Sequence, residues 1–251
     1  MPRADRLDLR RKQAAIWRAV EAQHLVSTMR LVDNDLEDQK ALENLVEGAK
    51  PQLPSETRGL HWVLSAPFRY RPRPGGSRFR GPGDPGVFYG AFERRTACAE
   101  TGYWRWRFVQ DSAGLLKLDA QPMSLFQARV RTQAADLTRA PHVAQRAKWT
   151  DPVNYAHTQS FARQARTACA GAIVYESVRD PEHGRCMAVL SPQAFVSGQS
   201  PATETWYLTV GLTGTTWTRT KEEAFSFSHA CVRSSERSPK VNIFAPTEFF
   251  Y

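Results

Sequence analysis

The spacing of apolar residues along the first part of the chain predicts two helices. Residues 10–32 carry apolar side chains at Ile16, Val20 and Leu31 with few helix breakers, which is the spacing of an amphipathic helix. A second helix is predicted over residues 36–49, with Asn34 or Asp35 as its N-cap. Its buried side is expected to carry Leu36, Leu42, Leu45 and Val46. We therefore expect an N-terminal helical segment over residues 1–50.

Beyond Pro51 the pattern changes to short strands mixed with helices. Residues 61–70, HWVLSAPFRY, are predicted to form a strand, and VFYGAF at 87–92 a short buried strand. Helices are expected over 93–108 and 156–170. Further strands are predicted at 115–120, 124–132, 171–178, 186–191, 205–212 and 213–220. This pattern favours one α+β domain over residues 51–251, in which 193–251 carries the fewest recognisable motifs.

Composition is that of a folded protein with an excess of basic residues. Hydrophobic residues make up 41% of the 251 positions, and the formal net charge is +9. Such a charge attracts phosphate groups of nucleic acids, nucleotides or acidic partners. The arginines gather in residues 69–80 and 94–107 among glycines and aromatic residues, instead of forming a basic stripe or tail. This distribution favours a phosphate-binding pocket over a nucleic-acid-binding surface.

Cysteine spacing and hydropathy exclude several other classes of protein. The four cysteines lie far apart without a CxxC pair, which indicates neither a zinc site nor a disulfide framework, so no metal is expected. No apolar run approaches the roughly 20 residues of a membrane-spanning helix. The N-terminal residues lack the apolar core of a secretory signal. We expect a cytoplasmic protein without membrane contact; delivery into the cytoplasm of a target cell is the alternative.

A glycine- and proline-rich loop and a helical glutamate form the first candidate site. Residues 71–86, RPRPGGSRFRGPGDPG, are predicted to form a loop whose glycines permit close approach to a ligand. Arg78, Tyr89 and Glu100 follow one another at intervals of eleven residues. The helix over 93–108 directs Glu100 inward, where a carboxylate needs a cation or a donor. Arg78 or ligand hydroxyls fit that need, although from spacing alone a structural ion pair is favoured.

Four motifs in order resemble those of the RES-domain family. They are YRPRPGGSRF at 70–79, VFYGAF at 87–92, TACAETGYWR at 96–105 and GAIVYESVRDPEHGRCMAVLSP at 171–192. The resemblance extends over about residues 11–192. It implies a fold related to ADP-ribosyltransferases, with a strongly bent central sheet flanked by helices. It also implies an activity that splits the nicotinamide glycosidic bond of NAD by phosphorolysis or hydrolysis.

The resemblance assigns site residues by matching position. Glu100, Arg78 and Ser177 would be catalytic, and the residues that would bind NAD are Arg69, Tyr70, Tyr89 and Gln159. The chain departs from the family pattern at Glu176, which replaces the usual proline before the serine. NAD would be a substrate, with inorganic phosphate as a possible co-substrate, and no cofactor is expected. The resemblance also implies a toxin restrained by a cognate antitoxin or immunity protein.

Physical chemistry supports these roles and leaves alternatives open. Guanidinium groups of Arg69, Arg78 or Arg179 suit the phosphates of NAD or an acceptor phosphate. Glu100 would stabilise the positive charge that develops on the ribose as nicotinamide leaves. Tyr89 could instead be a core residue with its hydroxyl bonded to backbone, Ser177 a cap of a local bend, and Gln159 a surface residue. The alternative functions are transfer of ADP-ribose to a macromolecule and, less favoured, non-enzymatic nucleic-acid binding.

Overall fold

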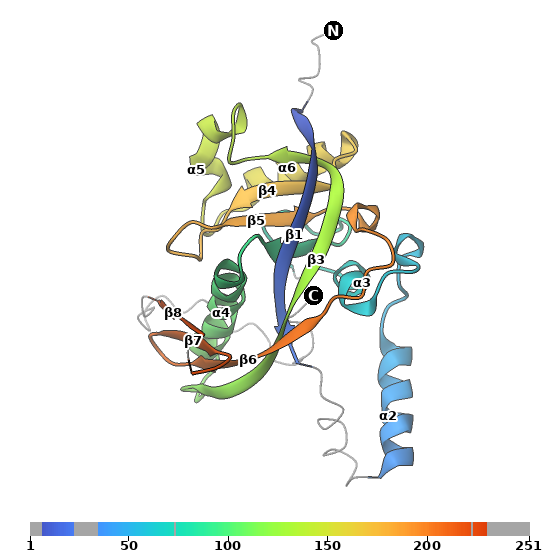
Figure 1. Ribbon diagram of the computed structural model, residues 1–251, viewed down its shortest axis with the longest axis vertical. Coiled ribbons are helices and arrows are strands. Elements are labelled where there is room, and N and C mark those ends of the chain that lie inside the picture. The colour runs from blue at the N-terminus through green and yellow to red at the C-terminus, as the bar shows by residue number, and fades with distance from the viewer. Residues whose placement is uncertain (1–6, 23–34, 73, 222, 230–251) are drawn as a thin grey trace.

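The computed structural model describes residues 7–22, 35–72, 74–221 and 223–229, in which helices pack around one mixed sheet (Figure 1). The strands are β1 (Leu9–Glu21), β2 (Phe88–Ala91), β3 (Leu118–Asp136), β4 (Ala172–Glu176), β5 (Arg185–Val189), β6 (Thr203–Val210), β7 (Gly214–Thr218) and β8 (Ala224–Ser228). The α-helices are α2 (Leu36–Ala49), α3 (Trp62–Arg69), α4 (Arg94–Asp111), α5 (Arg146–Trp149) and α6 (Ala156–Thr167). Short 3₁₀ turns lie at Ser55–Thr57, His142–Gln145 and Pro192–Ala194.

The sheet curls because its first and third strands pair with each other. The strand order is β1-β2-β5-β4-β3-β6-β7-β8, and β1 additionally pairs with β3, so the strands from β1 round to β3 close on themselves. The long strand β3 pairs with β1 along one edge, while its other edge pairs with β6 and, near Asp136, in parallel with β4. This arrangement confirms the predicted α+β class and the strongly bent central sheet.

Three groups of buried side chains fill the two faces of the curled sheet. Inside the curl, Ile16 and Val130 pack with Phe88 and with Leu64 of α3. On the outer face, β4 and β5 pack under α6, and Trp206 and Trp217 of β6 and β7 pack with Trp106 of α4. Helix α4 therefore lies against the sheet with one side, and the predicted helix over 93–108 and the short strand at 87–92 are confirmed.

The predicted helix over 10–32 is wrong for residues 9–21, which form β1. All thirteen residues of this strand pair with β3, from Leu9 opposite Ala135 to Glu21 opposite Met123. Ile16 and Ala19 are buried in this strand, so the helical spacing read from the sequence came from side chains that face two different parts of the core. Long-range pairing overrides a local helical pattern. Residues 23–34, the rest of that prediction, lie outside the described residues.

The predicted strand over 61–70 is wrong as well, because Trp62–Arg69 form helix α3. The imidazole Nδ1 of His61 accepts a hydrogen bond from the Val63 backbone N–H at 3.4 Å and caps the helix. Leu64 and Phe68, four residues apart, lie on one side and enter the core inside the curled sheet. Pro67 lies in the last turn, where it has no backbone N–H to donate to the carbonyl of Val63, and the helix ends two residues later.

Helix α2 forms as predicted but does not bury the predicted side. The Asp35 carboxylate caps it by accepting the backbone N–H groups of Glu37 and Asp38. Leu36 and Leu45 are each 72% exposed and Val46 is also exposed, whereas Gln39 is buried. The helix extends away from the body of the molecule (Figure 1).

Three of the four cysteines lie within the described residues. Cys98 and Cys186 are buried free thiols and Cys169 is an exposed one. Burial raises the pKa of Cys98 and of Cys186 well above the usual value. Cys231 lies outside the described residues. Among the described helices, none is both long and apolar enough to span a bilayer.

Candidate functional site

Glu100 projects from the middle of α4 and is partly buried. Desolvation by burial raises the pKa of its carboxyl group. A hydrogen bond from Ser177 and the positive charges of Arg78 and Arg179 act in the opposite direction and favour the carboxylate. The predicted inward orientation of Glu100 is therefore confirmed, and two guanidinium groups and one hydroxyl lie around it.

Ser177 follows β4 directly and is fully buried. Its hydroxyl donates a hydrogen bond to Oε1 of Glu100 at 2.5 Å, across 77 positions of sequence. The same Oγ accepts the backbone N–H groups of Arg179 at 3.2 Å and Asp180 at 3.0 Å. Since both acceptor positions of Oγ are used by the turn, the hydroxyl proton is directed to Glu100. Ser177 thus caps the local bend and also contacts the glutamate, so the two readings of this serine are compatible.

Arg78 connects the glycine-rich loop to the segment before α6. Its Nη1 donates to the backbone carbonyls of Trp149 at 3.0 Å and Asp151 at 2.9 Å, and its guanidinium lies 4.8 Å from the centre of the Tyr155 ring. The residue is only 8% exposed. Within the described part of the chain, Nε and Nη2 of Arg78 have no hydrogen-bond partner, so these two nitrogens remain to donate to a ligand.

Arg179 supplies the second guanidinium group beside Glu100. Its Cζ lies 3.7 Å from the centre of the Tyr103 ring, and its Nη2 donates to the Pro152 carbonyl at 2.6 Å and to the Tyr155 hydroxyl at 3.3 Å. Tyr155 therefore contacts both guanidinium groups, one through its ring and one through its hydroxyl. Arg78 and Arg179 come from distant loops and are fixed in place by the same aromatic residue.

Tyr89 and Gln159 bind the glycine-rich loop rather than open space. The Tyr89 hydroxyl accepts the Phe79 backbone N–H at 3.0 Å and lies 2.7 Å from Oγ of Ser77, so it grips both neighbours of Arg78. Nε2 of Gln159 donates to the carbonyls of Ser77 at 3.0 Å and Gly75 at 3.2 Å. For Tyr89 the structure shows the backbone-bonded hydroxyl that was the alternative to ring stacking.

Gly76 shows how tightly this loop is folded. Its φ of +70° lies in the left-handed region, and a Cβ added there would lie 2.1 Å from the carbonyl oxygen of Arg80. The backbone N–H of Ser77 donates to that same carbonyl at 2.7 Å. Arg78 is thus presented by a closed turn from Ser77 to Arg80.

Arg69 and Tyr70 take part in contacts on the other side of the loop. Nη1 of Arg69 donates to Glu47 of α2 at 2.7 Å, and its Nε donates to the Pro51 carbonyl. The carbonyl of Tyr70 accepts a hydrogen bond from Nη2 of Arg80 at 2.5 Å. The structure thus brings Glu100, Arg78 and Ser177 together. Tyr89 and Gln159 bind the loop residues next to Arg78. The Arg69 guanidinium instead binds Glu47 of α2.

The unexpected acid at Glu176 is neutralised by neighbours of its own. Nε of Arg146 donates to Oε2 of Glu176 at 2.7 Å, and Nδ1 of His183 lies 3.0 Å from Oε1. Its charge is therefore balanced by Arg146, the first residue of α5. Tyr103 and Tyr155 are site residues that the sequence analysis missed; the position of Tyr103, three residues after Glu100 on the same helix, was the available signal.

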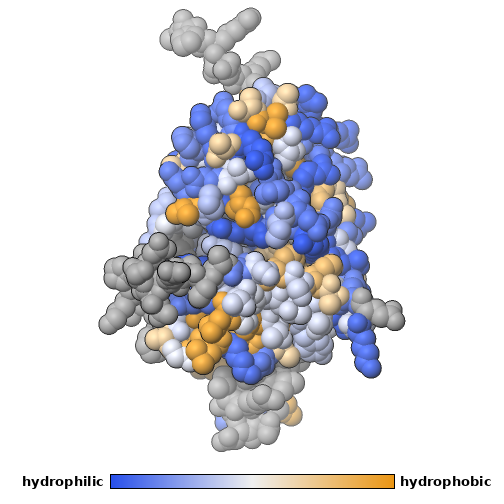
Figure 2. Space-filling view, turned by 90° about the vertical axis from the view of Figure 1, so that its left-hand side faces the viewer, coloured by the Kyte–Doolittle hydropathy of each residue, from blue (hydrophilic) through white to orange (hydrophobic). Residues whose placement is uncertain are grey.

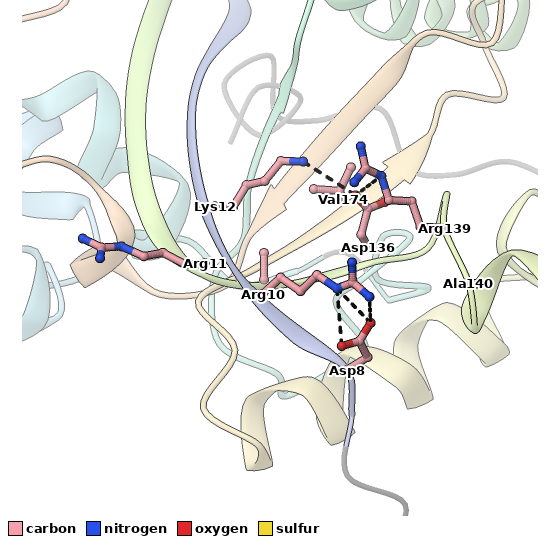
Figure 3. A pocket seen from close by; sticks show the side chains of 9 residues that line it. Asp8, Arg10, Arg11, Lys12, Asp136, Arg139, Ala140 and Val174 are labelled. Carbon is pink, nitrogen blue, oxygen red and sulfur yellow. Dashed lines mark hydrogen bonds and ion pairs between the residues drawn. The ribbon is translucent and has the colours of Figure 1, made fainter.

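Two small cavities lie elsewhere. One, of about 120 Å³, lies at the start of β1, and five of the charged residues that line it form ion pairs: Lys12 and Arg139 with Asp136, and Arg10 with Asp8 (Figure 3). The other, of about 180 Å³, lies between Val143, Trp149 and Glu176. Neither is lined by a predicted site residue. No cluster of metal-ligating side chains is present among the described residues.

The side of the molecule that carries α4, α5 and β8 is mostly hydrophilic in its upper part, with hydrophobic residues gathered below (Figure 2). Two exposed apolar residues near the candidate site are Trp104 on α4 and Val153 before α6. Trp104 lies edge to face against Tyr103, and its ring centre is 5.8 Å from the Arg179 guanidinium. Aromatic surface thus borders the Arg179 side of the site.

Comparison with known proteins gives a family and a distant structural likeness. A family model described as "RES domain" matches residues 53–210, more than half of the chain. Among solved structures, the chain is similar to one described as "Crystal structure of the M.tuberculosis MbcT-MbcA toxin-antitoxin complex", at 10% identity and a TM-score of 0.45. That alignment covers 81% of this chain and 86% of the other. No curated protein matches the sequence.

Proposed function

Because the chain belongs to the RES-domain family, we propose that it cleaves the bond between nicotinamide and ribose in NAD. The observation that supports this proposal is the contact between Glu100 and Ser177, flanked by the guanidinium groups of Arg78 and Arg179. A carboxylate with a fixed hydrogen bond beside two cations matches a substrate that combines ribose hydroxyls with two phosphate charges. The acceptor would be water or inorganic phosphate.

Each residue has a role that follows from its position. When the glycosidic bond breaks, its electron pair leaves with nicotinamide, whose ring nitrogen thereby becomes neutral, and positive charge develops on the ribose. The Glu100 carboxylate stabilises that charge more in the transition state than in the ground state. Water attacking the same ribose carbon loses a proton and gives ADP-ribose, whereas phosphate gives the ribose phosphate ester.

The two guanidinium groups would bind anions. Arg78 keeps two donor nitrogens, Nε and Nη2, for the pyrophosphate of NAD, and guanidinium groups bind phosphate oxygens in a bidentate manner. Arg179, on the other side of Tyr155, would bind a second anionic group, either the other phosphate of NAD or an acceptor phosphate. Tyr89 and Gln159 would act by fixing the loop that presents Arg78.

Release of nicotinamide from NAD by the purified protein, with and without phosphate, tests the proposal. Glu100→Gln keeps the size of the side chain and removes its charge, and we expect it to lower the rate at least about 100-fold. Asp111→Asn removes an exposed carboxylate at the end of the same helix and serves as the matched control, with an unchanged rate. Full activity of Glu100→Gln would refute the mechanism. Radiolabel transferred from NAD to a macromolecule would show ADP-ribosyl transfer instead.

The family also supports a biological role. We propose that the protein is a toxin that depletes NAD and is restrained by a cognate antitoxin or immunity protein. Expression of the wild-type chain alone should arrest growth and lower cellular NAD, while Glu100→Gln should not. Co-expression with the product of the adjacent gene, followed by co-purification, identifies the partner. Normal growth with active wild-type protein and no partner would contradict this role.

A further inference from the structure

Asp180 is a buried carboxylate that plays no part in the proposed chemistry. It is 2% exposed, and its Oδ2 accepts the Thr96 hydroxyl at 2.7 Å. Its Oδ1 accepts the guanidinium of Arg95 and the backbone N–H of Glu182 at 3.1 Å. Both of its oxygens are therefore satisfied by donors, two of which belong to the first turn of α4.

The start of α4 lacks an acid of its own, and Asp180 supplies one. Glu93 is the N-cap but makes no side-chain capping bond, and the first turn contains no acidic residue. A negative charge near the N-terminus of a helix is stabilised by the helix dipole and by donors from the first turn. Asp180, from the turn after β4, thus ties two segments together that are more than eighty positions apart.

This tie lies one helical turn away from Glu100. Thr96 and Glu100 are four residues apart, so they occupy the same side of α4. On the other segment, the backbone N–H of Asp180 donates to Oγ of Ser177 at 3.0 Å, and that serine bonds to Glu100. Two contacts therefore join α4 to the turn that carries Ser177. One is between Thr96 and Asp180, and the other is between Glu100 and Ser177.

Packing around the tie leaves no room for a looser arrangement. A Cβ added at Gly184 would lie 2.0 Å from Oγ1 of Thr96 and 2.8 Å from Oδ2 of Asp180. The carbonyl of Gly184 also accepts the backbone N–H of Ser177 at 2.8 Å. The glycine permits the turn to close against α4, and the turn carries Ser177 with it.

We propose that Asp180 is a positioning residue that aims the Ser177 hydroxyl at Glu100 by anchoring the turn from Ser177 to Asp180 onto the first turn of α4. The inference rests on the proposed function for its effect on catalysis. With both Oγ acceptor positions occupied by the turn, the direction of the serine proton is set by where the turn lies. Releasing Asp180 from α4 would let the turn move and the contact with Glu100 lengthen.

Thr96 offers the sharpest test, because its substitution changes no charge. Thr96→Val keeps the shape of the side chain and removes the donor to Asp180, whereas Thr96→Ser keeps the hydroxyl. We expect Thr96→Val to lower kcat for nicotinamide release about tenfold with KM changed less than about twofold, since misplacement of a catalytic group affects the transition state. Thr96→Ser should retain more than about half of the wild-type kcat. Asp180→Asn should lower kcat further.

The matched control removes the ion pair between Glu204 and Arg94, which lies in the same first turn of α4 as Thr96. Glu204 on β6 accepts two hydrogen bonds from Arg94, the residue that begins α4, and does not face Ser177. Glu204→Gln should leave kcat within about twofold of wild type at a comparable loss of thermal stability. Equal kcat in Thr96→Val and wild type, or an equal loss in Glu204→Gln, would overturn the positioning role.

A second measurement does not depend on activity. The carboxyl carbon of Glu100, labelled with ¹³C and assigned with Glu100→Gln, reports its titration by NMR. The hydrogen bond from Ser177 lowers the pKa of Glu100, so Thr96→Val should raise that pKa in the same direction as Ser177→Ala, by a smaller amount. The charged groups facing Glu100, which are Arg78, Arg179 and Asp180, and the neutral Tyr175 and Cys186 are unchanged in this variant.

The two measurements separate the failure of this inference from that of the proposed function. An inactive wild-type protein whose Glu100 titration shifts in Thr96→Val would refute NAD cleavage and support the positioning of Ser177. An active wild-type protein whose Glu100 titration and kcat are both unchanged in Thr96→Val would support NAD cleavage and refute the role of Asp180.

Discussion

The hydroxyl of Tyr89 should stabilise the glycine-rich loop, and Tyr89→Phe isolates that hydroxyl. The ring remains, so any contribution from packing or from stacking on a ligand is retained. The hydroxyl oxygen accepts the Phe79 N–H at 3.0 Å and lies 2.7 Å from Oγ of Ser77. Because the backbone N–H occupies an acceptor position, the tyrosine proton is free to go to Ser77. Burial raises the pKa of Tyr89, which keeps the hydroxyl protonated at neutral pH.

The size of the effect follows from what the substitution leaves behind. Phe79 is fully buried, so its N–H would lose its partner without access to water, which costs about 1–3 kcal/mol. Ser77 is only partly buried, and water can replace its lost bond at little net cost. We therefore expect Tyr89→Phe to lower the free energy of unfolding by about 2 kcal/mol.

Urea denaturation monitored by tryptophan fluorescence measures this change. Tyr207, which is 45% exposed on β6, provides the matched control, and Tyr207→Phe should change stability by less than about 0.5 kcal/mol. On the proposed function, Tyr89→Phe should also raise KM for NAD, since Ser77 and Phe79 flank Arg78. Wild-type stability and KM in Tyr89→Phe would refute the reasoning and favour a role for the ring alone.

Three further predictions concern the charge of Glu100, two glycines and Arg69. Burial raises the pKa of Glu100 above its ordinary value of 4.5, so the folded wild type binds a proton more tightly than the unfolded chain and loses stability as pH rises from about 4.5 through the raised pKa. Thermal melts of Glu100→Gln over the same pH range should lack this loss. Parallel curves of melting temperature against pH for the two proteins would contradict this prediction. Gly86→Ala would place a Cβ 2.3 Å from Cα of Phe68 and should lower the free energy of unfolding, measured in urea, by more than about 2 kcal/mol. In Gly48→Ala of helix α2, the added Cβ meets nothing within 4 Å, and the substitution should raise the free energy of unfolding by up to about 1 kcal/mol. Equal effects of the two substitutions would show that the loop at Gly86 moves to accommodate the Cβ. The Arg69 guanidinium binds Glu47 and the Pro51 carbonyl, so Arg69→Met should speed proteolysis at the junction between α2 and α3. The same substitution should leave KM for NAD within about twofold of wild type. A tenfold rise in KM would show that Arg69 contacts the substrate.

Local sequence signals predicted the helices whose spacing or capping depends on residues close in the sequence. Helix α4 is one case, because steps of three and four residues along it place Ala97 and Glu100 on the same side. The cap of α2 by Asp35 is another, since capping needs only the next few residues. The α+β class was also predictable, because most of the short strands were recognised as strands.

The wrong predictions share a cause, which is contact with distant parts of the chain. The strand β1 buries Ile16 inside the curled sheet, while its opposite face contacts α4 from Trp17 to Glu21. Its apolar residues therefore follow neither a clean alternation nor a true helical repeat. Helix α3 is short and contributes Val63, Leu64 and Phe68 to the core inside the curled sheet. Of these three residues, only Leu64 and Phe68 are separated by a helical spacing of four. Over so few residues, the pattern could not distinguish a helix from a strand.

The candidate site could be predicted only where side chains themselves recur in a motif. The acceptors that hold Arg78 are the backbone carbonyls of Trp149 and Asp151, and a carbonyl carries no sequence signal. The resemblance to the RES-domain family supplied Glu100, Arg78 and Ser177 as a set. It could not show that Arg69 reaches Glu47 of α2, because a resemblance matches residue types and does not show which side chains pair.

Charge balance around Glu100 indicates why an anion suits this site. The carboxylate of Asp180 is matched by Arg95, and that of Glu176 by Arg146, so both are balanced without the site. The guanidinium groups of Arg78 and Arg179 both act on Glu100, and Arg78 also acts on the carboxylate of Asp151. A buried cation is stable only with a counterion or with strong hydrogen bonds. Arg78 has backbone carbonyls at one nitrogen only, so on the proposed function a phosphate group at the other nitrogens would complete its hydrogen bonds.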